Sequence, residues 1–294
     1  MSSQPFTFGI ALIPRASARN WPLVEALLDL TLASIRAQTD PSFRVVIAGH
    51  DRPGVALRDP RFVFLEADWP VQEPGPHNAD GGRKKHAIND FVLARGGGFL
   101  MFLDADDWVP VRLVGAVRAT LRPDCIGALI ETGFMIDFQS LRAAAVPHPR
   151  VFDGSFHRIC GSSAVARLQP DDPDPLRRDP WNVLWSHHEW VEIARDRGVE
   201  LARLPVSGSY VTNTSENHSE LHGPYAAWRR TLTGCVNREG KPIDAALARR
   251  FGLDLGQIRA ASDRFSRARH PRSGTRPAEE AGRLSRIRQG SARR

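Results

Sequence analysis

The sequence predicts an α/β fold in which a mixed, mostly parallel sheet is flanked by helices. Apolar segments at residues 6–14, 43–48 and 61–66 have the length and composition of strands, and the segment 21–37 has helical spacing. Residues 99–103 form a further apolar run without interruption, which is typical of a strand buried on both faces of a sheet. A strand–helix–strand order calls for a right-handed crossover and therefore for parallel pairing.

The N-terminal elements carry clear boundary signals. Pro14 ends the first strand, because proline cannot donate to a ladder. Trp21-Pro22 opens the first helix, whose core face is marked by residues that recur at helical spacing: Val24, Leu27, Leu28, Thr31 and Ile35. Residues 39–42 (Thr-Asp-Pro-Ser) form a turn before the second strand.

Residues 81–86 read Gly-Gly-Arg-Lys-Lys-His, and a helix with Ala87, Ile88, Phe91 and Val92 on one side follows them. Two glycines followed by cations at the start of a helix can approach a phosphate, which makes Lys84 a candidate ligand. The alternative is a solvated group of charges on a surface helix.

Three carboxylates follow the central apolar run, at Asp104, Asp106 and Asp107. Pro110 fits the first turn of a helix, so these acids lie where a buried strand ends. In open α/β sheets, ligands bind at that edge. Like charges this close repel one another, and a divalent cation would offset the repulsion. Asp-x-Asp offers hard oxygen ligands for Mn²⁺ or Mg²⁺, with diphosphate oxygens completing the shell. Helix capping and a turn would explain one of these acids well, but not three.

The rest of the chain is less regular. Patterning predicts a helix around residues 113–121, strands at 126–131, 134–138 and 199–205, a loop at 170–180, a helix that begins near 186 or 187, a polar run at 207–222 and two or three helices between 224 and 262. We therefore expect a main domain over residues 1–222, a helical C-terminal extension over 223–263 and a basic disordered tail over 264–294.

Charge and cysteine content limit the function classes. The net charge of +7 comes from the tail, since residues 264–294 contain ten Arg and two Glu while the remainder has 30 basic and 31 acidic residues. A basic nucleic-acid-binding surface on the body is not indicated, and no specific nucleic-acid partner is expected.

Three cysteines without metal-like spacing suit a reducing compartment. No signal peptide or membrane span is recognisable, so we expect a cytoplasmic protein. For the tail, contact with an anionic membrane surface at the inner face is the alternative to solvated disorder.

The order of these pieces resembles the inverting nucleotide-sugar glycosyltransferases of GT-A type (family 2-like), closest to the bacterial rhamnosyltransferase-like group. The matching stretches are Ile10–Pro14, Ser34–Phe43 with its Gln-Thr turn, Asn89 after the cationic turn, and Phe102–Asp107. The resemblance covers about residues 6–220 and rests on the order of the elements more than on one motif. It implies a GT-A (Rossmann-like) fold and transfer of a sugar from a nucleotide diphosphate sugar to a hydroxyl, with a glycan or a lipid-linked molecule as acceptor.

The same resemblance assigns roles to individual residues. Asp106 would hold the metal, Asp104 would contact the ribose or the metal, and Asp107 would support them. His218 would be a further metal ligand, although a histidine in a polar loop is more often only solvated. The nucleotide-binding candidates are Asp51, Lys84, Asn89 and Asp104. Gly49 and His50 stand where the family commonly has two acids, so the nucleobase is left open.

The family's catalytic base is an acid at the start of a helix in the second half of the chain, and Glu189 fits that place. The chemistry needs a carboxylate to take the proton of the acceptor hydroxyl. Glu192 is the nearest rival, and a purely structural first-turn glutamate is the alternative. Trp181, Trp185 and Trp190 near Glu189 are core residues by default, or could stack on an acceptor sugar.

Three other function classes compete with the transferase. An aspartate-nucleophile phosphatase or phosphotransferase also carries Asp-x-Asp at a strand end, but normally after the first strand of its domain. A sugar-phosphate nucleotidyltransferase has a Gly-rich first turn, whereas Ile13 is followed here by Pro-Arg-Ala-Ser. A catalytically degraded protein that only binds a nucleotide sugar or a glycan is the third.

Overall fold

A seven-stranded mixed sheet forms the centre of the computed structural model, which describes residues 4–55 and 57–269. Its strands follow the order β3-β2-β1-β4-β8-β5-β9. Their bounds are β1 Phe6–Ala11, β2 Phe43–Gly49, β3 Phe62–Glu66, β4 Gly98–Phe102, β5 Gly127–Leu129, β8 Ala164–Leu168 and β9 Leu201–Arg203. The first four are parallel, and β8 is antiparallel to both of its neighbours. The predicted mixed, mostly parallel sheet is therefore confirmed.

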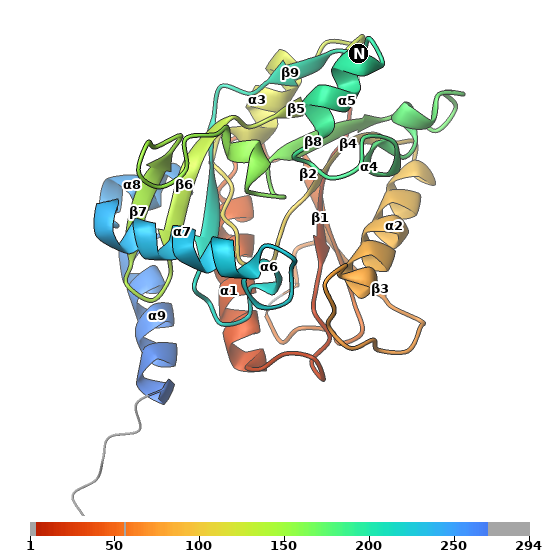
Figure 1. The fold of residues 1–294 in the computed structure, drawn as a ribbon. Coiled ribbons are helices and arrows are strands. Elements are labelled where there is room, and N and C mark those ends of the chain that lie inside the picture. The colour runs from red at the N-terminus through yellow and green to blue at the C-terminus, as the bar shows by residue number, and fades with distance from the viewer. Residues whose placement is uncertain (1–3, 56, 270–294) are drawn as a thin grey trace, which may run out of the picture.

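Helices cover both faces of this sheet (Figure 1). One core contains side chains of α1 (Trp21–Arg36) and α3 (Leu113–Thr120), and the other contains side chains of α2 (Ala79–Leu93), α4 (Pro180–Val183) and α5 (Trp190–Asp196). On β4, Phe99 and Met101 belong to the first core while Leu100 and Phe102 belong to the second. Burial on both faces explains why the apolar run of this strand is unbroken.

A second, four-stranded sheet has the order β10-β6-β7-β11. Its strands are β6 Thr132–Asp137, β7 Arg142–Val146, β10 Ser207–Thr212 and β11 Lys241–Pro242. Strand β10 corrects the prediction of a polar run from residue 207, because its residues pair in parallel with β6 and are largely buried. Small polar side chains such as Ser209 hide this burial from a hydropathy pattern.

The C-terminal helices pack on the second sheet and on α1. Helix α7 (Ala226–Glu239) lies across the second sheet, and α8 (Ala245–Arg250) and α9 (Leu255–Arg269) follow it (Figure 1). Phe251 and Ile258 share a core with Leu23 and Leu27 of α1. Helix α9 continues beyond residue 264, where the basic tail was predicted to begin, and residues 270–294 of that tail lie outside the described residues. None of the described helices is both long and apolar enough to cross a membrane.

The start of α2 differs from the prediction. The helix begins at Ala79, so Gly81 and Gly82 lie inside its first turn instead of forming a turn before it. Asn78 causes the early start, because its side-chain oxygen accepts a hydrogen bond from the Gly81 N–H at 3.3 Å. Lys84 is thereby placed on the inner side of the helix, where it is buried.

Two glycines of the second sheet make room for an aromatic ring. Gly133 of β6 and Gly208 of β10 are register partners, and a Cβ atom at either would collide with the ring of Phe156. Phe156 begins the short 3₁₀ helix η1 (Phe156–Arg158) and is fully buried. The pair of glycines therefore fixes η1 against the sheet.

Replacing Gly133 with Ala should lower the free energy of unfolding by at least about 2 kcal/mol, because an enclosed ring has little room to move. Urea denaturation measures the change. Gly115 in α3 is the control, since a Cβ atom there meets nothing within 4 Å and Ala should be neutral or stabilising. Equal stability of Gly133→Ala and the wild type would contradict the packing described here.

Candidate functional site

A cleft of about 880 Å³ opens at the carboxyl ends of the parallel strands. Its walls come from segments far apart in the sequence: residues 11–14 after β1, 72–81 around the start of α2, 104–106 after β4, 186–188 before α5, and 216–229 around α6 (His218–Leu221) and α7. A volume of this size is typical of small-molecule sites. The predicted position of the ligand site, at the carboxyl edge of β4, coincides with this cleft.

The three acids after β4 have different surroundings. Asp104 and Asp106 line the cleft, and Asp104 is exposed. Asp107 points inward and is buried, where its Oδ1 accepts from the Val211 N–H at 2.8 Å and its Oδ2 accepts from the Cys160 thiol at 3.5 Å. Asp107 thus joins β4 to the second sheet and fixes the backbone that carries the other two acids.

Asp104, Asp106 and Asp107 together form an acidic corner at the cleft, and its electrostatics favour a bound cation. Burial, together with the charges of Asp107 and Asp104, raises the pKa of Asp106 well above its usual range. A cation beside Asp106 would offset both effects, and carboxylate oxygens suit Mn²⁺ or Mg²⁺. Across residues 4–55 and 57–269, no three His, Cys, Asp or Glu side chains are grouped closely enough to hold a metal ion by themselves. A cation here would need ligands from its substrate.

His218 lines the same cleft, as the first residue of α6. Asn217 links α6 to Asp106, since its Nδ2 donates to Asp106 Oδ2 at 3.4 Å and its side-chain oxygen caps α6. Nε2 of His218 is buried and has no hydrogen-bond partner among the described residues. Burial and the neighbouring His222 lower the pKa of His218, so its imidazole is neutral and able to ligate a metal.

Asp107 should make the stability of the protein depend on pH. Burial and the charge of Asp104 raise the pKa of Asp107 to about 7 in the folded state, from an ordinary value near 3.8. Between these values the folded state binds more protons than the unfolded state, so the free energy of unfolding falls as the pH rises from about 4 to about 7. Asp107→Asn should flatten this slope in urea titrations with EDTA, and an unchanged slope would contradict the assignment.

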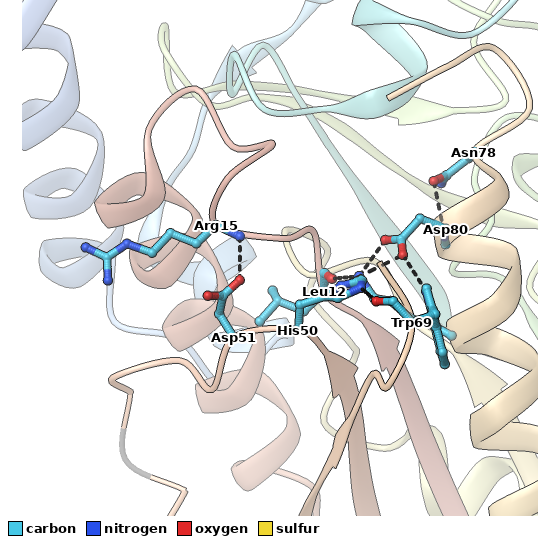
Figure 2. A network of polar contacts seen from close by, with 9 residues as sticks. Leu12, Arg15, His50, Asp51, Trp69, Asn78 and Asp80 are labelled. Atoms are coloured by element: carbon cyan, nitrogen blue, oxygen red, sulfur yellow. Dashed lines mark hydrogen bonds and ion pairs between the residues drawn. The ribbon is translucent and has the colours of Figure 1, made fainter. Parts of the chain in front are cut away.

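A polar network lies at the carboxyl ends of β1 and β2 (Figure 2). Nζ of Lys84 donates to the Leu12 carbonyl at 2.7 Å and pairs with Asp80. The Trp69 indole donates to the same carboxylate at 3.1 Å, and His50 Nε2 contacts the Trp69 carbonyl at 2.9 Å. Lys84 is therefore a buried structural cation that holds Leu12 at the cleft wall, and it does not itself line the cleft.

Two further nucleotide-binding candidates also lie outside the cleft lining. Asp51 accepts a hydrogen bond from the backbone N–H of Arg15 at 2.8 Å and so ties the loop after β1 to the end of β2 (Figure 2). Asn89 is buried in α2, and its Nδ2 donates to the Arg178 carbonyl at 2.9 Å. The structure thus brings Asp104, Asp106 and His218 together in one cleft but not Asp51, Lys84 or Asn89.

Glu189, the predicted base, is the residue before α5, and its side chain makes no capping hydrogen bond to that helix, which begins three or four residues later than the sequence suggested. Its side chain is 49% exposed, lies 3.7 Å from His188 Nε2 and does not line the cleft, whereas His187 and His188 do. Glu192 pairs with Arg158 at 2.9 Å. No observation on these residues tests their predicted role, and Glu189 stays a prediction.

The aromatic residues of the cleft are not those singled out in the sequence. Trp190 is fully buried and packs on Trp181, with ring centroids 5.4 Å apart, while Trp185 is 69% exposed outside the cleft lining. The cleft is instead lined by Tyr225 and Trp228 of the α7 region, which are 63% and 42% exposed. The sequence pattern did not predict that Tyr225 and Trp228 would line the cleft, because only the packing of α7 brings them there.

Comparisons with known proteins give weak structural likenesses. No protein-family model and no curated protein matches the sequence. A protein described provisionally as a nucleotide-diphospho-sugar transferase, from Desulfovibrio desulfuricans G20, superposes with a TM-score of 0.34 at 10% identity, over 79% of this chain and 97% of that one. The bifunctional IspDF of Campylobacter jejuni gives a TM-score of 0.35 at 12% identity, over 69% of this chain and 49% of that one. TM-scores this low assign no function to this chain, so the cleft itself is the basis for a functional proposal.

Proposed function

We propose that this chain is a metal-dependent, inverting glycosyltransferase that moves a sugar from a nucleotide diphosphate sugar to a hydroxyl acceptor. The observation that supports this most strongly is the pair Asp104 and Asp106, which lines a cleft of about 880 Å³ at the carboxyl ends of parallel strands. Such an edge is where α/β folds bind nucleotides, and two carboxylates in one cleft need a counter-charge.

The donor would lie with its diphosphate beside this acidic corner. Asp106, with Asp104 or the unpartnered Nε2 of His218 as a second ligand, would hold Mn²⁺ or Mg²⁺, and the diphosphate oxygens would complete the ligand set. When bound, the cation neutralises the charge that grows on the leaving diphosphate. Lys85 and Arg158 also line the cleft and add positive charge for the same group.

The acceptor would enter from the side of α7. A pyranose ring presents one face of C–H groups that packs well on an aromatic ring, and Tyr225 and Trp228 offer such rings. Phe152 holds Trp228 in place, with ring centroids 6.0 Å apart in an edge-to-face arrangement. A glycan, free or lipid-linked, fits this wall of the cleft.

Replacing Trp228 with Ala should raise the KM for a glycoside acceptor about tenfold, which corresponds to about 1.4 kcal/mol. The affinity for the donor should not change, because the proposed donor ligands are Asp104 and Asp106 and not Trp228. Trp185→Ala is the matched control, since Trp185 is more exposed but outside the cleft lining. Equal acceptor KM values for both variants would contradict an acceptor site at α7.

A thermal-shift screen of UDP-, GDP- and TDP-sugars, with and without Mn²⁺, tests the proposed function. We expect one nucleotide class to raise the unfolding temperature, and to do so more strongly with Mn²⁺. Release of the nucleoside diphosphate in the presence of octyl glycosides then separates a transferase from a protein that only binds. No stabilisation by any of these compounds would overturn the proposal.

A further inference from the structure

His187 carries an imidazole whose tautomer is fixed by the backbone. Its Nδ1 is hydrogen-bonded to the carbonyl oxygen of His157 in η1. A carbonyl can only accept, so Nδ1 carries the hydrogen, and in the neutral ring Nε2 keeps its lone pair. Because Phe156 is enclosed by Gly133 and Gly208, the carbonyl that fixes the ring is itself held firmly.

The imidazole is neutral, and its Nε2 is available in the cleft. Burial lowers the pKa of His187 to about 3, and the hydrogen bond that its Nδ1–H donates to the His157 carbonyl opposes this only in part. Within the described part of the chain, Nε2 of His187 has no hydrogen-bond partner. The atom is not fully enclosed by the protein, so a ligand can reach it. His187 lines the same cleft as Asp104 and Asp106.

Gly161 leaves a gap between His187 and Asp104. A Cβ atom at Gly161 would lie 3.9 Å from Nε2 of His187 and 3.8 Å from Oδ2 of Asp104. The two side chains therefore border one space without touching. An acceptor hydroxyl could then lie beside the lone pair of His187, and the diphosphate of the donor could lie beside the acidic corner.

The neighbouring acids are less suited to this gap. Glu189 does not line the cleft and lies next to His188, and Glu192 is paired with Arg158. Glu216 does line the cleft, but its Oε2 accepts from the backbone N–H of Arg19 at 3.1 Å. His187, by contrast, lines the cleft and borders the same space at Gly161 as Asp104.

We infer that Nε2 of His187 takes the proton of the acceptor hydroxyl during sugar transfer, an inference that rests on the proposed function. The acceptor oxygen forms a bond to the anomeric carbon while the bond from that carbon to the phosphate oxygen breaks. The electron pair of the broken bond leaves with the nucleoside diphosphate. The hydroxyl proton passes to Nε2, and the ring later releases it to water.

The environment of the ring suits this step. The hydroxyl becomes acidic only as its oxygen bonds to carbon, so a weak base can take its proton late in the reaction. A bound diphosphate would also raise the pKa of His187 through its negative charge, and the His157 carbonyl stabilises the protonated ring by holding Nδ1–H.

The test compares His187→Gln, His188→Gln and Glu189→Gln with the wild type. The donor is the nucleotide sugar that stabilises the wild type most in the thermal-shift screen, octyl glycosides serve as acceptors, and the readout is release of the nucleoside diphosphate. We expect His187→Gln to lower kcat at least 100-fold, with donor Kd and unfolding temperature close to wild type. His188→Gln, the matched neighbour that also lines the cleft, should keep kcat within about threefold, and Glu189→Gln tests the rival base.

Rescue by imidazole distinguishes chemistry from folding. Added imidazole should restore part of the kcat of His187→Ala in a saturable way and should not affect His188→Ala. Turnover of His187→Gln near the wild-type rate, or loss confined to Glu189→Gln, overturns the inference. Inactivity of His187→Ala that imidazole does not relieve, with normal donor binding, overturns it as well. A wild type that binds no donor would instead overturn the proposed function.

Discussion

Replacing Asp106 with Asn should weaken Mn²⁺-dependent binding of the nucleotide sugar by more than about 100-fold. The amide is nearly isosteric but carries no charge, so it cannot offset the charge of a cation at this corner. The same change removes a carboxylate whose pKa is raised by burial and by the charges of Asp107 and Asp104, so the variant should be at least as stable as the wild type without metal. Isothermal titration calorimetry with and without Mn²⁺ measures both the affinity and its metal dependence.

Asp153 provides the control for this experiment. It is exposed and lies outside the cleft lining, so Asp153→Asn makes the same change in charge without touching the site. Its donor affinity should equal that of the wild type. A similar loss of affinity in both variants would show that net charge, and not the acidic corner, controls binding.

Lys84→Met should lower the free energy of unfolding by about 3 kcal/mol or more. The change leaves Asp80 and the Leu12 carbonyl without the cation that now bonds to both, and burial prevents water from replacing it fully. Because Leu12 lines the cleft, donor binding should weaken too, as a consequence of the displaced wall. Urea unfolding gives the stability, and donor titration gives the second effect.

Lys85→Met is the matched control, one residue along the same helix. Lys85 lines the cleft, and its Nζ lies 5.6 Å from the ring centre of Phe102. We expect its loss to change donor affinity with little change in stability. If Lys84→Met were as stable as Lys85→Met, the description of Lys84 as a structural cation would be wrong.

The central sheet could be predicted because its signals are local. Mostly apolar segments marked β1 and β2, an unbroken apolar run marked β4, and Pro22 marked the start of α1. Strand β8 was missed, since Ala164–Leu168 is short and contains two alanines that favour helices. The cationic turn was misplaced because the cap at Asn78 extends α2 over both glycines.

The site could be predicted only in part, because only some of its residues are marked by local patterns in the sequence. Asp104 and Asp106 are near β4 in sequence, so a strand prediction was enough to place them at the sheet edge. His187 depends on a hydrogen bond to His157, 30 residues away, and Trp228 depends on the packing of α7. Neither contact leaves a periodic pattern in the sequence.

A crystal structure of the protein soaked with Mn²⁺ and the preferred nucleoside diphosphate would test the central claim most directly. The account predicts that Mn²⁺ bridges Asp106 and the diphosphate inside the cleft, with the gap at Gly161 open between them and His187. A nucleotide bound at another surface, or Mn²⁺ bound away from Asp104 and Asp106, would contradict it.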